Sequence, residues 1–205
     1  MLITENLSAT QIIADPFPHL LATNLLPAEV YSKMQEALPD LPTLLKGQKP
    51  GSNRRFNYSA TNIAFNPQIP QHFKTFVQDH LNQAFLDDFL RLFGSHILSQ
   101  YPDFESRYKP LKQLKAGIRG ADGFSDADVL LDVQIAFNTP SAVAGTTVRS
   151  AHIDCPRKLF VGLFYMRQPG DQSSGADLNI CRAKSKNLQL DATRTADEKD
   201  IETVT

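Results

Sequence analysis

Apolar residues recur at helical spacing through the first half of the chain. One such pattern begins at Pro27, whose ring suits the first turn of a helix, and ends at Pro39. A wider apolar stripe covers residues 70–93, and Gly94 follows as a residue typical of helix C-terminal caps. The pattern therefore predicts a helical layer over residues 1–110.

The second half of the chain shows the alternation of strands. Over residues 129–137, apolar side chains alternate with Asp132 and Gln134, which is typical of a half-buried strand. Residues 159–166 are apolar on both faces and predict a central strand, and the alternation resumes over residues 176–181. Helices followed by strands favour a β-sandwich or barrel with a helical layer packed against it.

Composition and charge narrow the class of protein. The chain has 205 residues with 41% hydrophobic content, which is enough for one globular core. Its formal net charge of −1 excludes a strong electrostatic attraction to nucleic acid or to an anionic membrane. There is no apolar run of about 18 residues, no secretory signal pattern, and only Cys155 and Cys181 as cysteines. We therefore expect a cytoplasmic protein whose partners are neither nucleic acids nor membranes.

The triplet His152-Ile153-Asp154 is the main candidate for chemistry. Residues two apart in a strand project from the same face, so the imidazole and the carboxylate can converge on one metal ion. This supplies two of the three ligands of the 2-His-1-carboxylate site of non-haem Fe(II) oxygenases. A surface histidine paired with a nearby aspartate is the alternative, and the triplet taken alone favours it.

The sequence around the triplet resembles a known enzyme family. Residues 149–167, followed by Gly175-Ala176-Asp177-Leu178, resemble the 2-oxoglutarate and Fe(II)-dependent oxygenases of the prolyl-hydroxylase-like group. In that family the His-x-Asp strand is followed by a hydrophobic strand with a late Tyr, a turn, and a small-residue-acid-Leu segment. Residues 15–27 also resemble the family's approach to its first helix.

The resemblance implies an α+β fold, in which an N-terminal helical layer packs on a double-stranded β-helix (jelly-roll) core. It predicts a single oxygenase-like domain over residues 1–181, helical over 1–110 and with jelly-roll strands over 111–181. The following residues, 182–205, are rich in charge and predict a polar, poorly ordered tail.

The resemblance also implies roles for individual residues. His152 and Asp154 match the first two iron ligands of the family, and Tyr165 matches the Tyr of the strand after them. Gln134 and Asn138 lie on a preceding strand that faces the pocket in the family. Gln134, Asn138 and Tyr165 are therefore candidates for binding the cosubstrate 2-oxoglutarate or the substrate. For Gln134 and Asn138, ordinary strand polarity is an equal alternative.

The chain departs from the family after Asp154. The family places its third iron ligand, a His, on a late strand, with an Arg or Lys beyond it that grips 2-oxoglutarate. The 51 residues after Asp154 (205 minus 154) contain no His, and Arg194 has no preceding His to support that role. Either the chain stops before the closing strands or it has lost half of the site. We expect truncation and an incomplete fold, because the family pattern persists to Cys181 and then ends.

These observations predict a non-haem Fe(II)/2-oxoglutarate-dependent dioxygenase. It would hydroxylate a small-molecule or peptidyl substrate, but we expect it to be truncated and inactive as written. The alternative is a non-catalytic jelly-roll binding or interaction protein. A third interpretation, Cys155 as a nucleophile activated by His152, is disfavoured because residues three apart in a strand face opposite sides. No oligomeric state is predicted.

Overall fold

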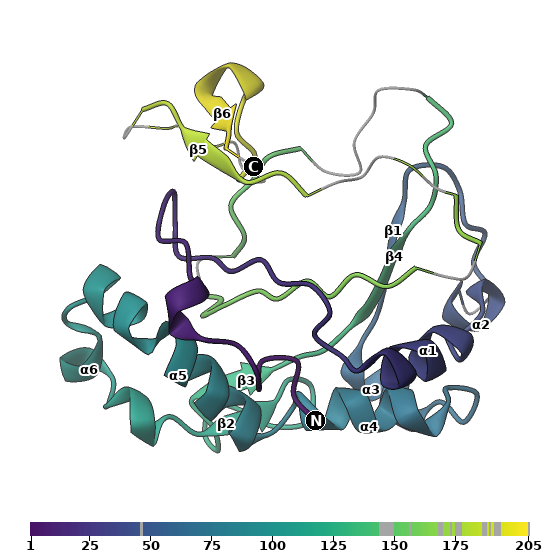
Figure 1. The fold of residues 1–205 in the computed structure, drawn as a ribbon, viewed down its shortest axis with the longest axis horizontal. Helices are drawn as coiled ribbons and strands as arrows, with labels where there is room; N and C mark the ends of the chain where they lie inside the picture. Colours follow the sequence, from purple (N-terminus) through teal and green to yellow (C-terminus); the bar gives the residue numbers. More distant parts are fainter. Residues whose placement is uncertain are drawn as a thin grey trace. The chain divides into compact units, whose positions relative to one another are not determined.

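The structure is a computed structural model (Figure 1). Its chain forms two compact units. Unit 1 comprises Met1–Lys46 and Asn57–Ala136, and unit 2 comprises Gly47–Phe56 and Phe137–Thr205. The sequence predicts a single domain over residues 1–181, and its periodicity gives no sign that a loop of the helical half belongs to unit 2. The structure describes residues 1–45, 47–143, 150–155, 157–167, 170–172, 174, 178–185, 188, 190 and 194–204.

Unit 1 is mainly helical, as the apolar spacing predicts. Its helices are α1 (Ala28–Glu36), α2 (Leu41–Leu45), α3 (Ala60–Phe65), α4 (Gln71–Asp79), α5 (Gln83–Gln100) and α6 (Phe104–Arg107), with short 3-10 turns η1 (Ala9–Gln11) and η2 (Leu111–Gln113). Helix α5 is the longest and contacts α6, η1, η2 and a strand of the unit (Figure 1). Among the described residues, no helix is both long and apolar enough to cross a membrane.

The helix expected over residues 70–93 is divided into α4 and α5. Helix α4 ends at Asp79 with His80 as its C-cap, and α5 starts after Asn82. The side-chain oxygen of Asn82 accepts a hydrogen bond from the N–H of Phe85 at 3.1 Å, which satisfies a donor that the first turn would leave unpaired. The apolar stripe continues across this break, so periodicity alone does not reveal it.

Gly94 lies within α5 and does not end it. The helix continues to Gln100, and Gly94 is buried. A Cβ at this position would lie 3.4 Å from Cδ1 of Leu111, which is tighter than an ordinary contact. Close packing against η2 therefore explains the glycine better than the predicted cap does.

Six short strands pair within the described residues. They are β1 (Arg55–Tyr58), β2 (Ala116–Ile118), β3 (Val129–Leu131), β4 (Ile135–Asn138), β5 (Cys181–Ala183) and β6 (Ile201–Thr203). Strand β2 pairs in parallel with β3, whereas β5 pairs antiparallel with β6, and β1 pairs with β4. The strand predicted over residues 129–137 is thus divided between two sheets, because alternation specifies the faces of a strand and not its hydrogen-bonding partner. The jelly-roll core stays a prediction.

The core of unit 1 is formed largely by residues of α3, α4 and α5. Ile63, Ile69, Leu86 and Leu92 are its largest fully buried side chains. Burying a Leu or Ile side chain contributes about 1.5–3 kcal/mol relative to leaving it exposed, so these four positions together contribute about 6–12 kcal/mol. The helical half therefore has an apolar core of its own.

Two expectations for unit 2 differ from the structure. Residues 159–167 carry no strand, and Leu163 and Tyr165 are exposed, although the apolar run predicts a central strand. The polar tail expected over residues 182–205 contains η3 (Glu198–Asp200) and β6. Strand pairing depends on backbone partners, which apolar or polar composition does not identify.

Candidate metal centre

Backbone hydrogen bonds hold the triplet His152-Ile153-Asp154 beside a later segment of unit 2. The N–H of Ile153 donates to the carbonyl of Arg194 at 3.0 Å, and His152 forms an isolated antiparallel bridge with Thr195. The guanidinium Nε of Arg194 returns a hydrogen bond to the carbonyl of Ile153 at 3.1 Å. His152 thus lies in an isolated bridge, whereas Ile153 and Asp154 carry no strand assignment.

The donor atoms of His152 and Asp154 face each other. Nε2 of His152 lies 3.6 Å from Oδ1 of Asp154, and the two side chains are 24% and 35% exposed. Two ligands that are each about 2.1 Å from one metal ion lie about 3.0 Å apart at a right angle and about 3.6 Å apart at about 120°. The pair is thus close enough to share one ion, and a right-angled arrangement requires the atoms to approach by roughly half an ångström. Their role as iron ligands stays a prediction.

The backbone fixes which nitrogen of His152 carries the proton. Nδ1 lies 2.7 Å from the carbonyl oxygen of Ser150, and a carbonyl oxygen only accepts hydrogen bonds. In the neutral ring, Nδ1 therefore donates and Nε2 presents its lone pair toward Asp154. Metal-binding histidines commonly have this outer hydrogen bond to a backbone carbonyl. A lone pair that faces a carboxylate is stabilised by a metal ion between the two, or by a proton on the nitrogen.

Lys158 forms an ion pair with Oδ2 of Asp154, the carboxylate oxygen that does not face His152. Its Nζ lies 3.0 Å from Oδ2, and the lysine side chain is about half exposed. This ammonium partly neutralises the carboxylate, so a cation at Oδ1 would experience less negative charge than an unpaired aspartate provides. Sequence reasoning missed this pair, because residues four apart lie close together in a helix but not in the strand that was expected here.

Arg157 contacts a different group from its neighbour Lys158. Hydrogen bonds from the backbone N–H of Arg157, and then from its guanidinium, lower the pKa of the Cys155 thiol below its usual value. The positive charge of Arg194 acts in the same direction. These basic residues therefore stabilise the thiolate form of Cys155.

The described residues place two candidate metal ligands at this position and no third. They contain no group of three or more His, Cys, Asp or Glu side chains placed to hold a metal ion. His152 is the one histidine in the sequence of unit 2, and the other four, at positions 19, 72, 80 and 96, belong to unit 1. The donor set thus fits two positions of an iron site.

The three predicted cosubstrate contacts lie on exposed parts of their units. In unit 1, Gln134 lies between β3 and β4 and not on a strand, and its side-chain amide donates to Oδ2 of Asp132 at 2.6 Å. In unit 2, Asn138 is an exposed residue of β4, and Tyr165 is 64% exposed. Their roles in binding 2-oxoglutarate stay predictions.

Comparison with known proteins gives no match. No protein-family model, no curated protein and no solved structure is significantly similar to this chain. The arguments for function are therefore the geometry at His152 and Asp154 and the resemblance of the surrounding sequence.

Proposed function

We propose that this chain is a non-haem Fe(II)/2-oxoglutarate-dependent dioxygenase of the cytoplasm that hydroxylates a small-molecule or peptidyl substrate. The observation that carries the proposal is the convergence of Nε2 of His152 and Oδ1 of Asp154 at 3.6 Å. A bound ferrous ion would supply O2 activation coupled to the oxidative decarboxylation of 2-oxoglutarate. Both cysteines are free thiols, which suits a reducing compartment.

Neighbouring groups orient the two proposed ligand atoms, Nε2 of His152 and Oδ1 of Asp154. The carbonyl of Ser150 holds the imidazole of His152 in the tautomer that presents Nε2. Lys158 holds Oδ2 of Asp154 and leaves Oδ1 directed at the histidine. Two protein ligands leave several coordination positions for the two oxygens of a 2-oxoacid and for O2. With only two protein ligands, however, we expect weak metal binding.

A non-catalytic binding or interaction protein is the second candidate. The ion pair between Asp154 and Lys158 favours it, because a carboxylate that already has a lysine partner has less need of a metal ion. In this case His152, Asp154 and Lys158 form a surface charge cluster, and replacing His152 has no effect on metal affinity.

Metal titration of the whole chain distinguishes these two functions. We expect Co(II), used as an oxygen-stable substitute for Fe(II), to bind the wild type with a visible absorption band. His152→Ala and Asp154→Ala should each weaken the affinity at least about tenfold, because each removes one of two ligands. His72→Ala, which removes an exposed histidine of unit 1, is the matched control and should bind like the wild type. Equal affinity of wild type and His152→Ala would contradict the metal site and support the binding protein.

A turnover assay tests the reaction itself. Purified protein is incubated with Fe(II) and 2-oxoglutarate, and succinate is measured with and without His152→Ala. We expect little turnover, because two protein ligands hold iron weakly. Succinate that forms at the same rate in the variant would show that the product does not come from this site.

A further inference from the structure

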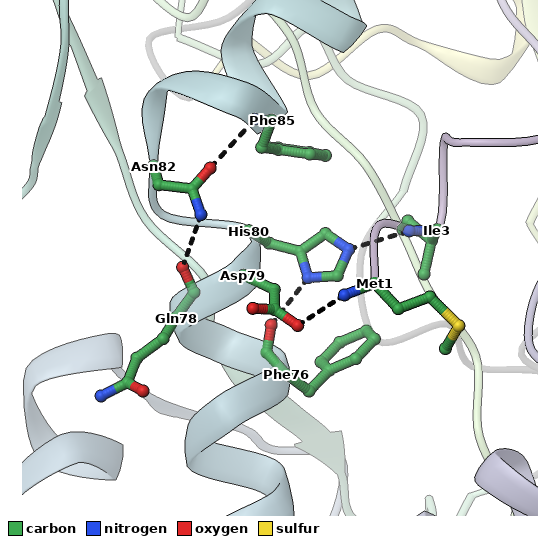
Figure 2. A network of polar contacts seen from close by, with 8 residues as sticks. All are labelled: Met1, Ile3, Phe76, Gln78, Asp79, His80, Asn82 and Phe85. Carbon is green, nitrogen blue, oxygen red and sulfur yellow. Dashed lines mark hydrogen bonds and ion pairs between the residues drawn. The ribbon is translucent and has the colours of Figure 1, made fainter.

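The imidazole of His80 is buried where α4 ends in unit 1 (Figure 2). Its side chain is packed between Phe76, whose ring centre is 4.4 Å away, and Phe85 of α5 at 5.0 Å. Nδ1 lies 2.7 Å from the carbonyl oxygen of Phe76, which belongs to the last turn of α4. The ring therefore acts as a side-chain cap of α4.

The second ring nitrogen of His80 holds the start of the chain. The backbone N–H of Ile3 donates to Nε2 at 3.0 Å, as Figure 2 shows. Because Nδ1 must donate to a carbonyl and Nε2 must accept from an N–H, these contacts require the neutral ring in one tautomer. His80 thus joins α4 to residues 1–8, which we call the N-terminal segment.

Two further contacts hold the N-terminal segment without using the imidazole. The amino group of Met1 forms an ion pair with Asp79 at 2.8 Å (Figure 2). The guanidinium of Arg91 donates to the carbonyls of Leu7 at 3.1 Å and Thr4 at 3.4 Å. Both contacts are on exposed residues or chain ends, where hydrogen bonds and ion pairs contribute little. The hydrogen bond to His80 is partly buried and its acceptor ring is 2% exposed, so it is better shielded from water than these two contacts.

We propose that His80 is a pH-sensitive latch for the N-terminal segment. With Nε2 unprotonated, the latch is closed on Ile3. Protonation places a donor N–H of the ring opposite the donor N–H of Ile3, and two donors cannot share a hydrogen bond. Ile3 then separates from the ring. The bond from Nδ1 to Phe76 remains and is strengthened, because a cation is favoured at a helix C-terminus.

The surroundings of the ring set the direction of the pH dependence. Burial lowers the pKa of His80 below its usual value of 6.5, and the carbonyl of Phe76 and the carboxylate of Asp79 oppose this in part. The Met1 amino group lowers the pKa further, and α5 presents to the ring the uncharged side chain of Phe85. The unfolded chain therefore takes up the proton first. The contribution of the closed latch to stability is complete above about pH 6.5 and decreases as the pH falls from there toward the folded pKa.

The latch is tested by NMR of the whole chain from about pH 8 to about pH 4.5. The ring protons of His80 report its titration, and the amide of Ile3 reports the contact. We expect both to change with the same midpoint, below that of an exposed histidine, and hydrogen-exchange protection at Ile3 to fall about tenfold or more after correction for intrinsic exchange. His72→Gln removes an exposed histidine of α4 and should keep this behaviour.

Two variants separate the latch from other causes. His80→Gln offers an acceptor that does not titrate, so the pH dependence at Ile3 should disappear. Asp79→Asn removes the ion pair with Met1 but keeps His80, so the pH dependence should persist with a lower midpoint. The proposal is overturned if Ile3 remains protected while His80 titrates in the wild type, a result that needs no variant to fold. It is also overturned if folded His80→Gln releases Ile3 at the wild-type midpoint.

Discussion

The rings of His80 in unit 1 and His152 in unit 2 each lie against a backbone carbonyl at Nδ1, but their Nε2 atoms face groups of opposite hydrogen-bonding type. In each ring Nδ1 lies 2.7 Å from a backbone carbonyl, that of Phe76 or of Ser150. Nε2 of His80 then faces a donor, the N–H of Ile3, whereas Nε2 of His152 faces an acceptor, the carboxylate of Asp154. A proton on Nε2 therefore disrupts the first contact and stabilises the second. Identical backbone anchoring can thus direct Nε2 of one imidazole at an N–H donor and Nε2 of another at a carboxylate.

Burial is the second difference between the two rings. His80 is 2% exposed and lies among aromatic side chains, whereas the side chain of His152 is 24% exposed. Water can replace a lost hydrogen bond at the exposed ring but not at the buried one. The two sites should therefore differ strongly in how much their loss destabilises the protein.

Alanine substitution tests this difference and has the largest expected effect on stability. We expect His80→Ala to lower the free energy of unfolding by about 2–4 kcal/mol, because it leaves a cavity and unpaired groups at Ile3 and Phe76. We expect His152→Ala to cost less than about 1 kcal/mol, since solvent reaches that ring. Urea unfolding followed by far-UV circular dichroism near neutral pH measures both. Similar losses in the two variants would show that burial does not distinguish the rings.

Asn82 provides a smaller test of the surroundings of His80. Its side chain caps α5 at the N–H of Phe85, the residue whose ring packs on His80 (Figure 2). We expect Asn82→Ala to cost about 1 kcal/mol in urea unfolding, the usual effect of losing an N-cap. Asn82→Asp retains a capping oxygen and should stay close to the wild type. If Asn82→Asp loses as much as Asn82→Ala, the cap is not the cause.

The sequence predicts the helices better than the sheets, and the reason is physical. A helix satisfies its backbone hydrogen bonds within one segment, so apolar spacing is enough to identify α1 and most of α5. A strand needs a partner elsewhere, so the apolar run at 159–166 and the alternation at 129–137 do not specify pairing. The break before α5 had a signal in Asn82, a preferred N-cap residue, but the continuous apolar stripe obscured it.

At the candidate site, the sequence predicts that the side chains of His152 and Asp154 lie close together. It does not predict the other groups that contact these two side chains. The i, i+2 spacing of His152 and Asp154 predicts side chains that lie close together, and Nε2 and Oδ1 are 3.6 Å apart, while their use as metal ligands stays a prediction. The carbonyl of Ser150, which sets the tautomer, is a backbone group and has no signature in the residue types. The contact of Lys158 with Asp154 depends on local backbone geometry, because in a regular strand residues four apart are separated by about 13 Å.

Replacing Lys158 has the smallest of the expected effects. It tests whether the carboxylate of Asp154, which faces Nε2 of His152, binds a metal ion. If Asp154 binds a metal ion, the ammonium of Lys158 competes with that ion for the carboxylate. Lys158→Met should then raise Co(II) affinity about 1.4- to fivefold, since exposed ion pairs contribute about 0.2–1 kcal/mol. Arg157→Met, which removes a neighbouring cation whose hydrogen bonds go to Cys155, should change the affinity less. If Asp154 is only a member of a surface ion pair, Lys158→Met leaves metal affinity unchanged.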